Sequence, residues 1–181
     1  MEKIDKTAIR NEAAVAALFF GLISGAYIII TGFMGTGVAE TMIKMVLWLA
    51  KFVGCIWLMC FLMKKLCKKY EGVTNSDTKN YGILIALFSA IIVAVVSYIA
   101  SAYIFPDQLA KSMDEALAMY GSMLDSNSLS MMDEMMEKMP AISLISNFIW
   151  CFLYGTILSA IVSAKIPSKD PFAEYKKEDE E

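Results

Sequence analysis

Histidine is missing from this sequence of 181 residues. Histidine is the usual proton shuttle near neutral pH, a frequent metal ligand and the common base that activates a serine or cysteine nucleophile. Its absence therefore argues against most hydrolase and metalloenzyme mechanisms. We predict no catalytic residue, no cofactor-binding residue, no cofactor and no metal ligand in this chain, and we expect a protein that is not an enzyme.

Charged residues are also few. They make up 19% of the chain, whereas hydrophobic residues make up 57%. A soluble domain of this length cannot bury that much apolar surface in a single core, so we expect the lipid bilayer to solvate much of it. The net charge of -3, with lysines gathered near the ends of apolar segments, leaves no basic face for phosphates. This pattern argues against a nucleic-acid partner.

Cysteine is scarce as well, with four residues in the chain. Cys55, Cys60 and Cys151 fall inside apolar segments, and Cys67 lies among lysines. None of them lies in a segment that we expect to meet an oxidising compartment, so we predict no disulfide framework.

Four apolar segments are long enough to cross a bilayer, which takes about 20 residues of α-helix. We predict an all-α membrane protein in which residues 1–165 form a bundle of four transmembrane helices. Residues 166–181 have too little apolar content to fold and are predicted to be a disordered cytoplasmic tail. The first segment is too long for the apolar region of a signal peptide, which is about 7–15 residues, so we expect it to stay uncleaved. The predicted spans cover residues 13–34, 41–63, 81–105 and 141–164.

Lysine and arginine are distributed unevenly between the two sides of the predicted bundle. Three lie in the N-terminal lead, five in the predicted loop from Lys64 to Lys79 and four from Lys165 onward. The segment 106–140, between the third and fourth spans, has two of them beside seven acidic residues. The positive-inside rule therefore predicts a multi-pass protein of the bacterial inner membrane with both termini in the cytoplasm and the acidic segment outside.

The outer segment 106–140 carries apolar residues at helical spacing. Those between Leu109 and Leu124 share one face, which predicts an amphipathic helix after Asp107. Ser130 can cap a second, shorter helix that ends before Pro140, where the fourth span is predicted to begin. We therefore predict a helical hairpin that lies on the outer mouth of the bundle.

Methionine is concentrated in the same segment, above all in MMDEMMEKM at residues 131–139. Thioethers are donors that Cu(I) prefers, so a soft-metal site is one interpretation. The other is that methionine supplies a flexible apolar underside to an amphipathic helix. Because the sequence places no histidine or cysteine nearby, we favour packing and predict that the segment binds no metal.

Small residues recur at every fourth position in the first and last spans. In lipid, helices associate through close van der Waals packing, and small residues let two backbones approach. We favour packing within the chain, with a homodimer face through GLISG as the alternative. The residues assigned to helix packing are Ala17, Gly21, Gly25, Gly155 and Ser159.

The order of these segments resembles a known family. The chain reads GLISGAYIII, a lysine-rich KKLCKKYEG, then YGILIALFSAIIVAVVSYIASAYIFPD, a long acidic loop, and a last span that ends ILSAIVSAKIPSKDPF. This order is similar to that of small four-span inner-membrane proteins from Bacteroidetes-type bacteria, which form a domain of unknown function. The resemblance covers nearly the whole chain and implies the fold and the membrane, but no functional residue.

Lys51 is the one charge that lies deep in a predicted span. Its amine can snorkel along apolar neighbours toward the outer headgroups, which is the interpretation that we favour. Alternatively it faces the bundle interior and serves an anionic substrate or a coupling proton, because a charge in lipid is costly and usually functional. The predicted spans contain no Asp or Glu, so an interior amine would depend on hydroxyls, water or an amide such as Asn147.

Two hypotheses about function follow. The first is a non-enzymatic structural or accessory bundle that acts in the lipid bilayer through a membrane protein partner or a second copy. The second is a small transporter or channel-like protein with Lys51 in the permeation or substrate path. The sequence shows neither an intramembrane acid nor an inverted repeat, features that carriers often have, and this favours the first hypothesis.

Overall fold

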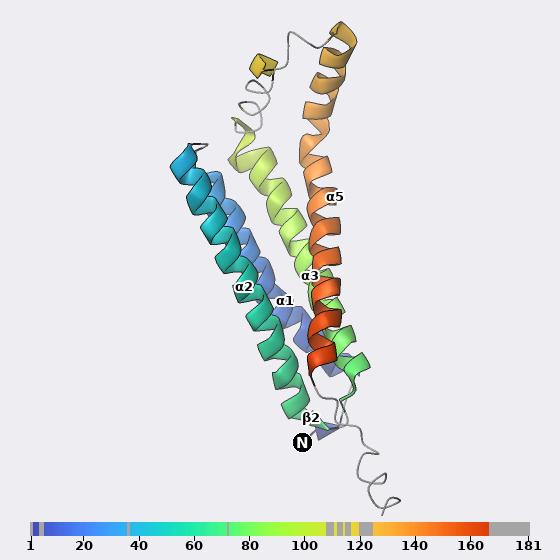
Figure 1. Ribbon diagram of the computed structural model, residues 1–181. Coiled ribbons are helices and arrows are strands. Elements are labelled where there is room, and N and C mark those ends of the chain that lie inside the picture. The colour runs from blue at the N-terminus through green and yellow to red at the C-terminus, as the bar shows by residue number, and fades with distance from the viewer. Residues whose placement is uncertain are drawn as a thin grey trace, which may run out of the picture.

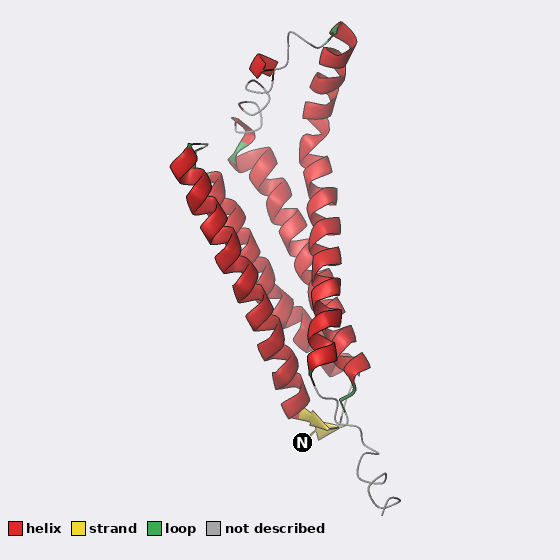
Figure 2. Ribbon diagram, viewed as in Figure 1, coloured by secondary structure: helices red, strands yellow, loops and turns green. Residues whose placement is uncertain are grey.

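The computed structural model describes residues 2–3, 6–35, 37–71, 73–107, 111, 114, 117–119 and 125–166. Nearly all of these residues are helical, as Figures 1 and 2 show. Four helices are long and apolar enough to cross a membrane, which confirms the predicted fold class. The elements are β1 (Glu2–Lys3), α1 (Lys6–Gly32), α2 (Val38–Lys69), β2 (Tyr70–Glu71), α3 (Asn75–Ile99), the π-helix η1 (Ala100–Ile104) and α5 (Ser126–Lys165).

The helices run alternately in opposite directions (Figure 1). One end of the bundle holds the end of α1, the start of α2 and the start of α5, and we call it the distal end. The other holds β1, which pairs in parallel with β2, and the end of α5; we call it the terminal end. Helix α3 is the hub, because it packs along both α1 and α5, whereas α2 contacts the other three helices only sparsely.

Small residues set the spacing between α1 and α3. Ala17 is fully buried, and Gly21 and Gly25 continue its row along α1. A Cβ atom built on Gly21 would lie 2.6 Å from Cγ2 of Ile92, so only glycine permits this approach. The GLISG motif thus lies in a contact within the chain, where van der Waals packing replaces the hydrophobic effect that operates in water.

The contact between α3 and α5 is built in the same way. A Cβ atom on Gly155 would lie 2.5 Å from Cβ of Ala86. Ser159 is fully buried and donates a hydrogen bond from Oγ to the carbonyl oxygen of Lys79, 2.9 Å away. The residues predicted for helix packing on α5 therefore face α3 rather than lipid.

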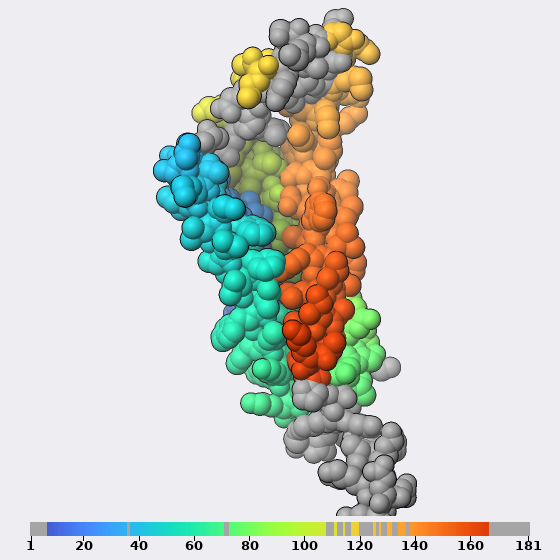
Figure 3. Space-filling model, viewed as in Figure 1, coloured from blue at the N-terminus to red at the C-terminus, as the bar shows by residue number. Residues whose placement is uncertain are grey.

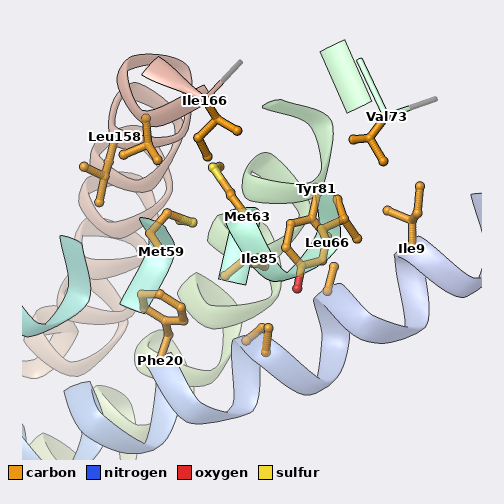
Figure 4. Close-up of a cluster of buried hydrophobic side chains, with 14 of the residues drawn as sticks. Ile9, Phe20, Met59, Met63, Leu66, Val73, Tyr81, Ile85, Leu158 and Ile166 are labelled. Atoms are coloured by element: carbon orange, nitrogen blue, oxygen red, sulfur yellow. The ribbon is translucent and has the colours of Figure 1, made fainter. Parts of the chain in front are cut away.

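A cluster of large apolar side chains joins all four helices toward the terminal end (Figure 4). Met59 and Met63 of α2 are buried there, near Leu158 of α5 and Ile166, which directly follows α5. This cluster is where α2 attaches to the other helices. Its labelled members are Ile9, Phe20, Met59, Met63, Leu66, Val73, Tyr81, Ile85, Leu158 and Ile166.

The predicted loop after the second span is mostly helix. Helix α2 continues through its lysines to Lys69, because Leu66 and Tyr70 are buried and anchor the last turn. The Tyr70 hydroxyl donates to Oε1 of Glu12 at 3.0 Å, and Lys69 forms an ion pair with the same carboxylate. Glu12 of α1 therefore fixes the end of α2.

Helix α3 also begins before the predicted third span. The Thr74 hydroxyl accepts a hydrogen bond from the Asp77 backbone at 3.2 Å, and the Asp77 carboxylate accepts one from the Thr74 backbone at 3.0 Å. This reciprocal capping box starts the helix at Asn75. The residues Asn75, Ser76 and Asp77, which sequence analysis placed in a loop, form its first turn.

The prediction that a separate short helix ends before Pro140 was wrong. Helix α5 runs without interruption from Ser126 to Lys165 with Pro140 inside it. A proline removes one backbone donor and crowds the carbonyl one turn earlier, but such a position can be tolerated when that carbonyl lies outside the lipid. The first helix of the predicted hairpin falls mostly outside the described residues, as does the predicted tail beyond Ile166, so both stay predictions.

Candidate functional site

A cavity of about 200 Å³ lies between the four helices. Helix α2 contacts α3 and α5 only sparsely, and the small residues Ala86, Ser89 and Gly155 form part of the opposite wall. Figure 3 shows that α2 and α5 lie apart toward the distal end, whereas the α5 residues of the cavity, from Cys151 to Leu158, lie in the terminal half of that helix. The lining residues are Phe20 and Ser24 of α1; Trp48, Lys51, Phe52, Cys55 and Met59 of α2; Ile85, Ala86, Ser89 and Val93 of α3; and Cys151, Tyr154, Gly155 and Leu158 of α5.

The wall that α2 contributes follows helical periodicity. Lys51, Cys55 and Met59 are spaced four residues apart and therefore share one face of the helix. Trp48, one turn before Phe52, stacks on it with ring centroids 5.5 Å apart, and Phe52 in turn meets Tyr154 of α5 at 5.5 Å. A row of three aromatic rings thus connects α2 to α5 beside the cavity.

Among the residues that the structure describes, Lys51 is the only cationic one that lines this cavity, and none of them contributes a carboxylate to it. Its side chain is half-buried, and Nζ lies 4.4 Å from the ring centroid of Tyr27 on α1. An ammonium over an aromatic face gains about 0.5–2 kcal/mol, more as water is excluded. No hydrogen bond or ion pair joins this amine to another described residue, so its charge has the Tyr27 ring as its visible counterpart.

The direction of the Lys51 side chain agrees in part with snorkelling toward the outer headgroups and in part with an amine that faces the bundle interior. Thirteen residues separate Val38 from Lys51, which at 1.5 Å per residue places the lysine backbone about 20 Å from the distal end of α2. Tyr27 is five residues from Gly32, about 8 Å from the distal end of α1. The amine therefore reaches toward the distal end, but it does so between helices and against the cavity rather than along the lipid face.

Asn147 does not accompany Lys51. Its side-chain nitrogen donates to Oγ of Ser97 at 2.9 Å and to the carbonyl oxygen of Ser143 at 2.8 Å. The two serine hydroxyls lie 3.1 Å apart. This cluster joins α5 to α3, so the structure does not bring Asn147 to Lys51. Hydrogen bonds between polar side chains of this kind hold transmembrane helices together.

The sequence did not predict that Tyr27 would contact the Lys51 amine, or that Tyr154 would line the same cavity as Lys51. A tyrosine inside an apolar helix is ordinarily a packing or interface residue, so neither position carried a distinctive signal. The only signal in the sequence was Lys51 itself, as a lone charge in an apolar segment. Its aromatic neighbours depend on how α1, α2 and α5 are arranged in space.

A family model described as a protein of unknown function, DUF4199, matches residues 16–166. The chain belongs to the DUF4199 family. No curated protein and no solved structure matches it. In this DUF4199 protein the matched region contains every residue that lines the cavity, together with the packing seams of α1 and α5. The predicted resemblance to a domain of unknown function is confirmed, and the bacterial group stays a prediction.

Proposed function

We propose that this DUF4199 protein is a non-enzymatic accessory membrane protein that binds a hydrophobic molecule with an anionic group in the cavity at Lys51. The observation that carries this proposal is an ammonium, without a carboxylate partner among the described residues, at the wall of a largely apolar cavity. A charge held in lipid is costly, and a bound anion would offset that cost. The apolar wall would hold the rest of the molecule.

The size of the cavity narrows the class of ligand. At about 200 Å³ it is smaller than pockets for drug-sized ligands, which are about 300–1,000 Å³. A medium-chain alkyl carboxylate fits this volume better than a sugar or a nucleotide, which would also leave polar groups facing apolar side chains. The proposed ligand class is therefore a medium-chain carboxylate or a similar amphiphilic anion.

Trp48 lies in the cavity wall and can report binding. Trp57 and Trp150 are exposed away from it, so the variant Trp57→Phe/Trp150→Phe leaves one reporter. In detergent, 8-bromooctanoate should quench Trp48 fluorescence saturably, and its methyl ester should do so at least about tenfold more weakly, because a charge-assisted interaction contributes about 1.5–3 kcal/mol.

The charge dependence separates binding from partition into the micelle. In the single-tryptophan protein, Lys51→Met should weaken the quenching by 8-bromooctanoate about tenfold. Lys68→Met removes a charge from the exposed end of the same helix and should leave the curve unchanged. Equal, non-saturating quenching by acid and ester would overturn the proposal.

A transporter is the second candidate, and the position of Lys51 among the four helices favours it. Against it, no carboxylate of the described part of the chain lines the cavity, and α1 and α2 are continuous through their lengths. Carriers commonly bind their substrates at broken helices or beside intramembrane acids. Saturable binding without any Lys51-dependent flux of the same carboxylate into liposomes would favour the binding protein.

The accessory role implies a partner in the membrane. The small-residue seams of α1 and α5 are occupied by α3, so we place the partner on another surface of the bundle rather than on a GLISG homodimer face. We also propose the inner membrane of a bacterium, with both termini in the cytoplasm. The lysine and arginine distribution supports this orientation, and so does the meeting of β1 and the end of α5 at one end of the bundle (Figure 1).

A further inference from the structure

We propose that a groove between α2 and α5 binds one acyl chain of an anionic phospholipid, with the phosphate held by Lys64 and Lys165. The groove has a volume of about 470 Å³ and runs between the terminal halves of the two helices, which lie side by side in Figure 3. It is distinct from the cavity at Lys51 and does not depend on the function proposed for that cavity.

Two lysines mark the terminal end of the groove. Lys64 closes it from α2 and Lys165 from α5, and both side chains are exposed. Among the residues that the structure describes, no carboxylate lines the groove, and neither lysine forms an ion pair or hydrogen bond. Lys69, in contrast, is paired with Glu12. A phosphodiester would supply the missing negative charge, as it does in basic pockets between transmembrane helices.

The wall beyond the lysines is apolar and about one leaflet long. Ile56 and Cys60 line it from α2, and Ile157 and Ile161 line it from α5. From Lys64 to Phe52 there are twelve residues, which at 1.5 Å per residue span about 18 Å. One leaflet is half of a hydrocarbon core of about 30 Å, so its thickness is similar to the length of the groove. A free phosphate would use only the lysines, whereas a phospholipid also fills the apolar wall, so the geometry selects the lipid.

The inner end of the groove meets the aromatic row beside the cavity. Phe52, Tyr154 and Leu158 line both the groove and the cavity, and the rings of Phe52 and Tyr154 lie 5.5 Å apart between them. An acyl chain that entered at the lysines would end against this pair of rings. The lining of the groove therefore ends at the depth where one chain of a leaflet ends.

Native mass spectrometry of the delipidated full-length protein tests the proposal. With phosphatidylglycerol and phosphatidylcholine of identical acyl chains, the first phosphatidylglycerol should bind at least about tenfold more tightly. Lys64→Gln/Lys165→Gln should reduce this preference to that of phosphatidylcholine. Lys68→Gln/Lys79→Gln removes the same charge from exposed lysines near the same end and should keep the preference. Equal loss in both double variants would show general surface attraction and overturn the proposal.

A steric variant tests the apolar part with both lysines present. Ile161 is 53% exposed on the groove wall, so Ile161→Trp should fill the groove without opening the helix contacts. Ile161→Trp should lower the affinity for phosphatidylglycerol about tenfold. Inorganic phosphate at millimolar concentration should not compete with the lipid. Unchanged binding in Ile161→Trp, or displacement by phosphate, would contradict a lipid in the groove. The lysine variants decide the matter independently if this variant does not fold.

Discussion

At the scale of single residues, Lys51 carries a charge that is costly in the membrane and that would serve the proposed binding of an anion. Its amine contacts the face of Tyr27 and has no hydrogen-bond partner among the described residues. Its stem lies against the cavity wall that Cys55 and Met59 continue. Holding the amine there costs desolvation free energy, and the aromatic contact offsets only part of it.

This arrangement predicts that Lys51→Met is as stable as the wild type or more stable. The methionine keeps the apolar stem and removes the charge, and no protein polar group loses a hydrogen bond. Thermal unfolding in one detergent should show an unchanged midpoint or a rise of about 2–4 °C, which corresponds to about 1 kcal/mol in a protein of this size. Tyr27→Phe, which keeps the ring, is the matched control.

A clear fall in the midpoint for Lys51→Met would contradict this account. It would mean that the amine satisfies polar groups or trapped water in the interior, each of which costs about 1–3 kcal/mol when left unpaired. The transporter candidate would then gain support, because such polar groups could form part of a path for an anion or a proton.

The sequence could reveal Lys51 but not its surroundings. A lone charge in an apolar segment is visible from composition, whereas the contact with Tyr27 depends on how α1 and α2 face each other. Asn147 was likewise visible in the sequence as a polar residue in a span. Its hydrogen-bond partners, Ser97 of α3 and Ser143 of its own helix α5, could not be predicted from the sequence. Polar side chains in lipid more often fasten helices together than build sites.

At the scale of helices, the small-residue seams explain why α3 is the hub. Gly21 and Gly25 of α1 face Ile92 and Val96 of α3, and Gly155 of α5 faces Ala86. Helix α2 has no comparable seam in contact, and its contacts with the other helices are sparse. The cavity and the lipid groove both lie along α2, because this helix leaves space that the others close.

This asymmetry predicts a large difference between two glycine substitutions. Gly21→Leu would push its side chain into Ile92 and force α1 away from α3, so we expect a loss of about 1–3 kcal/mol. Gly54→Leu on α2 meets nothing within 4 Å and should change stability little. Thermal unfolding in detergent compares them. If Gly21→Leu kept its stability but lost a crosslinked dimer, the seam would serve an oligomer instead.

The ends of the helices were harder to predict than their existence. Lysines suggested a loop after residue 63, but buried Leu66 and Tyr70 extend α2 beyond the apolar run. Proline suggested a break at residue 140, but α5 continues through it. In each case hydropathy marks the boundary of the lipid and not the end of the helix. The helix continues where one of its faces is packed or its backbone hydrogen bonds can still form.

At the scale of the whole molecule, the two ends of the bundle differ in charge. The terminal end holds Lys64, Lys68, Lys69 and Lys165, and the distal end leads into the acidic segment 106–140. Both β1 and the end of α5 lie at the terminal end (Figure 1). With an even number of crossings the two ends of the described chain share a side, and we propose from the charge difference that this side is the cytoplasm.

The last prediction tests this orientation. In a background with the four native cysteines replaced by serine or alanine, Lys68→Cys and Asn127→Cys each introduce one exposed thiol, at the terminal and distal ends respectively. An impermeant maleimide, added to cells whose outer membrane is permeabilised, should label position 127 and leave position 68 unlabelled until the inner membrane is opened. The reverse pattern would invert the protein, and the phosphates that face Lys64 and Lys165 would then belong to the outer leaflet. Labelling of both positions while the inner membrane is still intact would contradict a membrane-spanning bundle in either orientation.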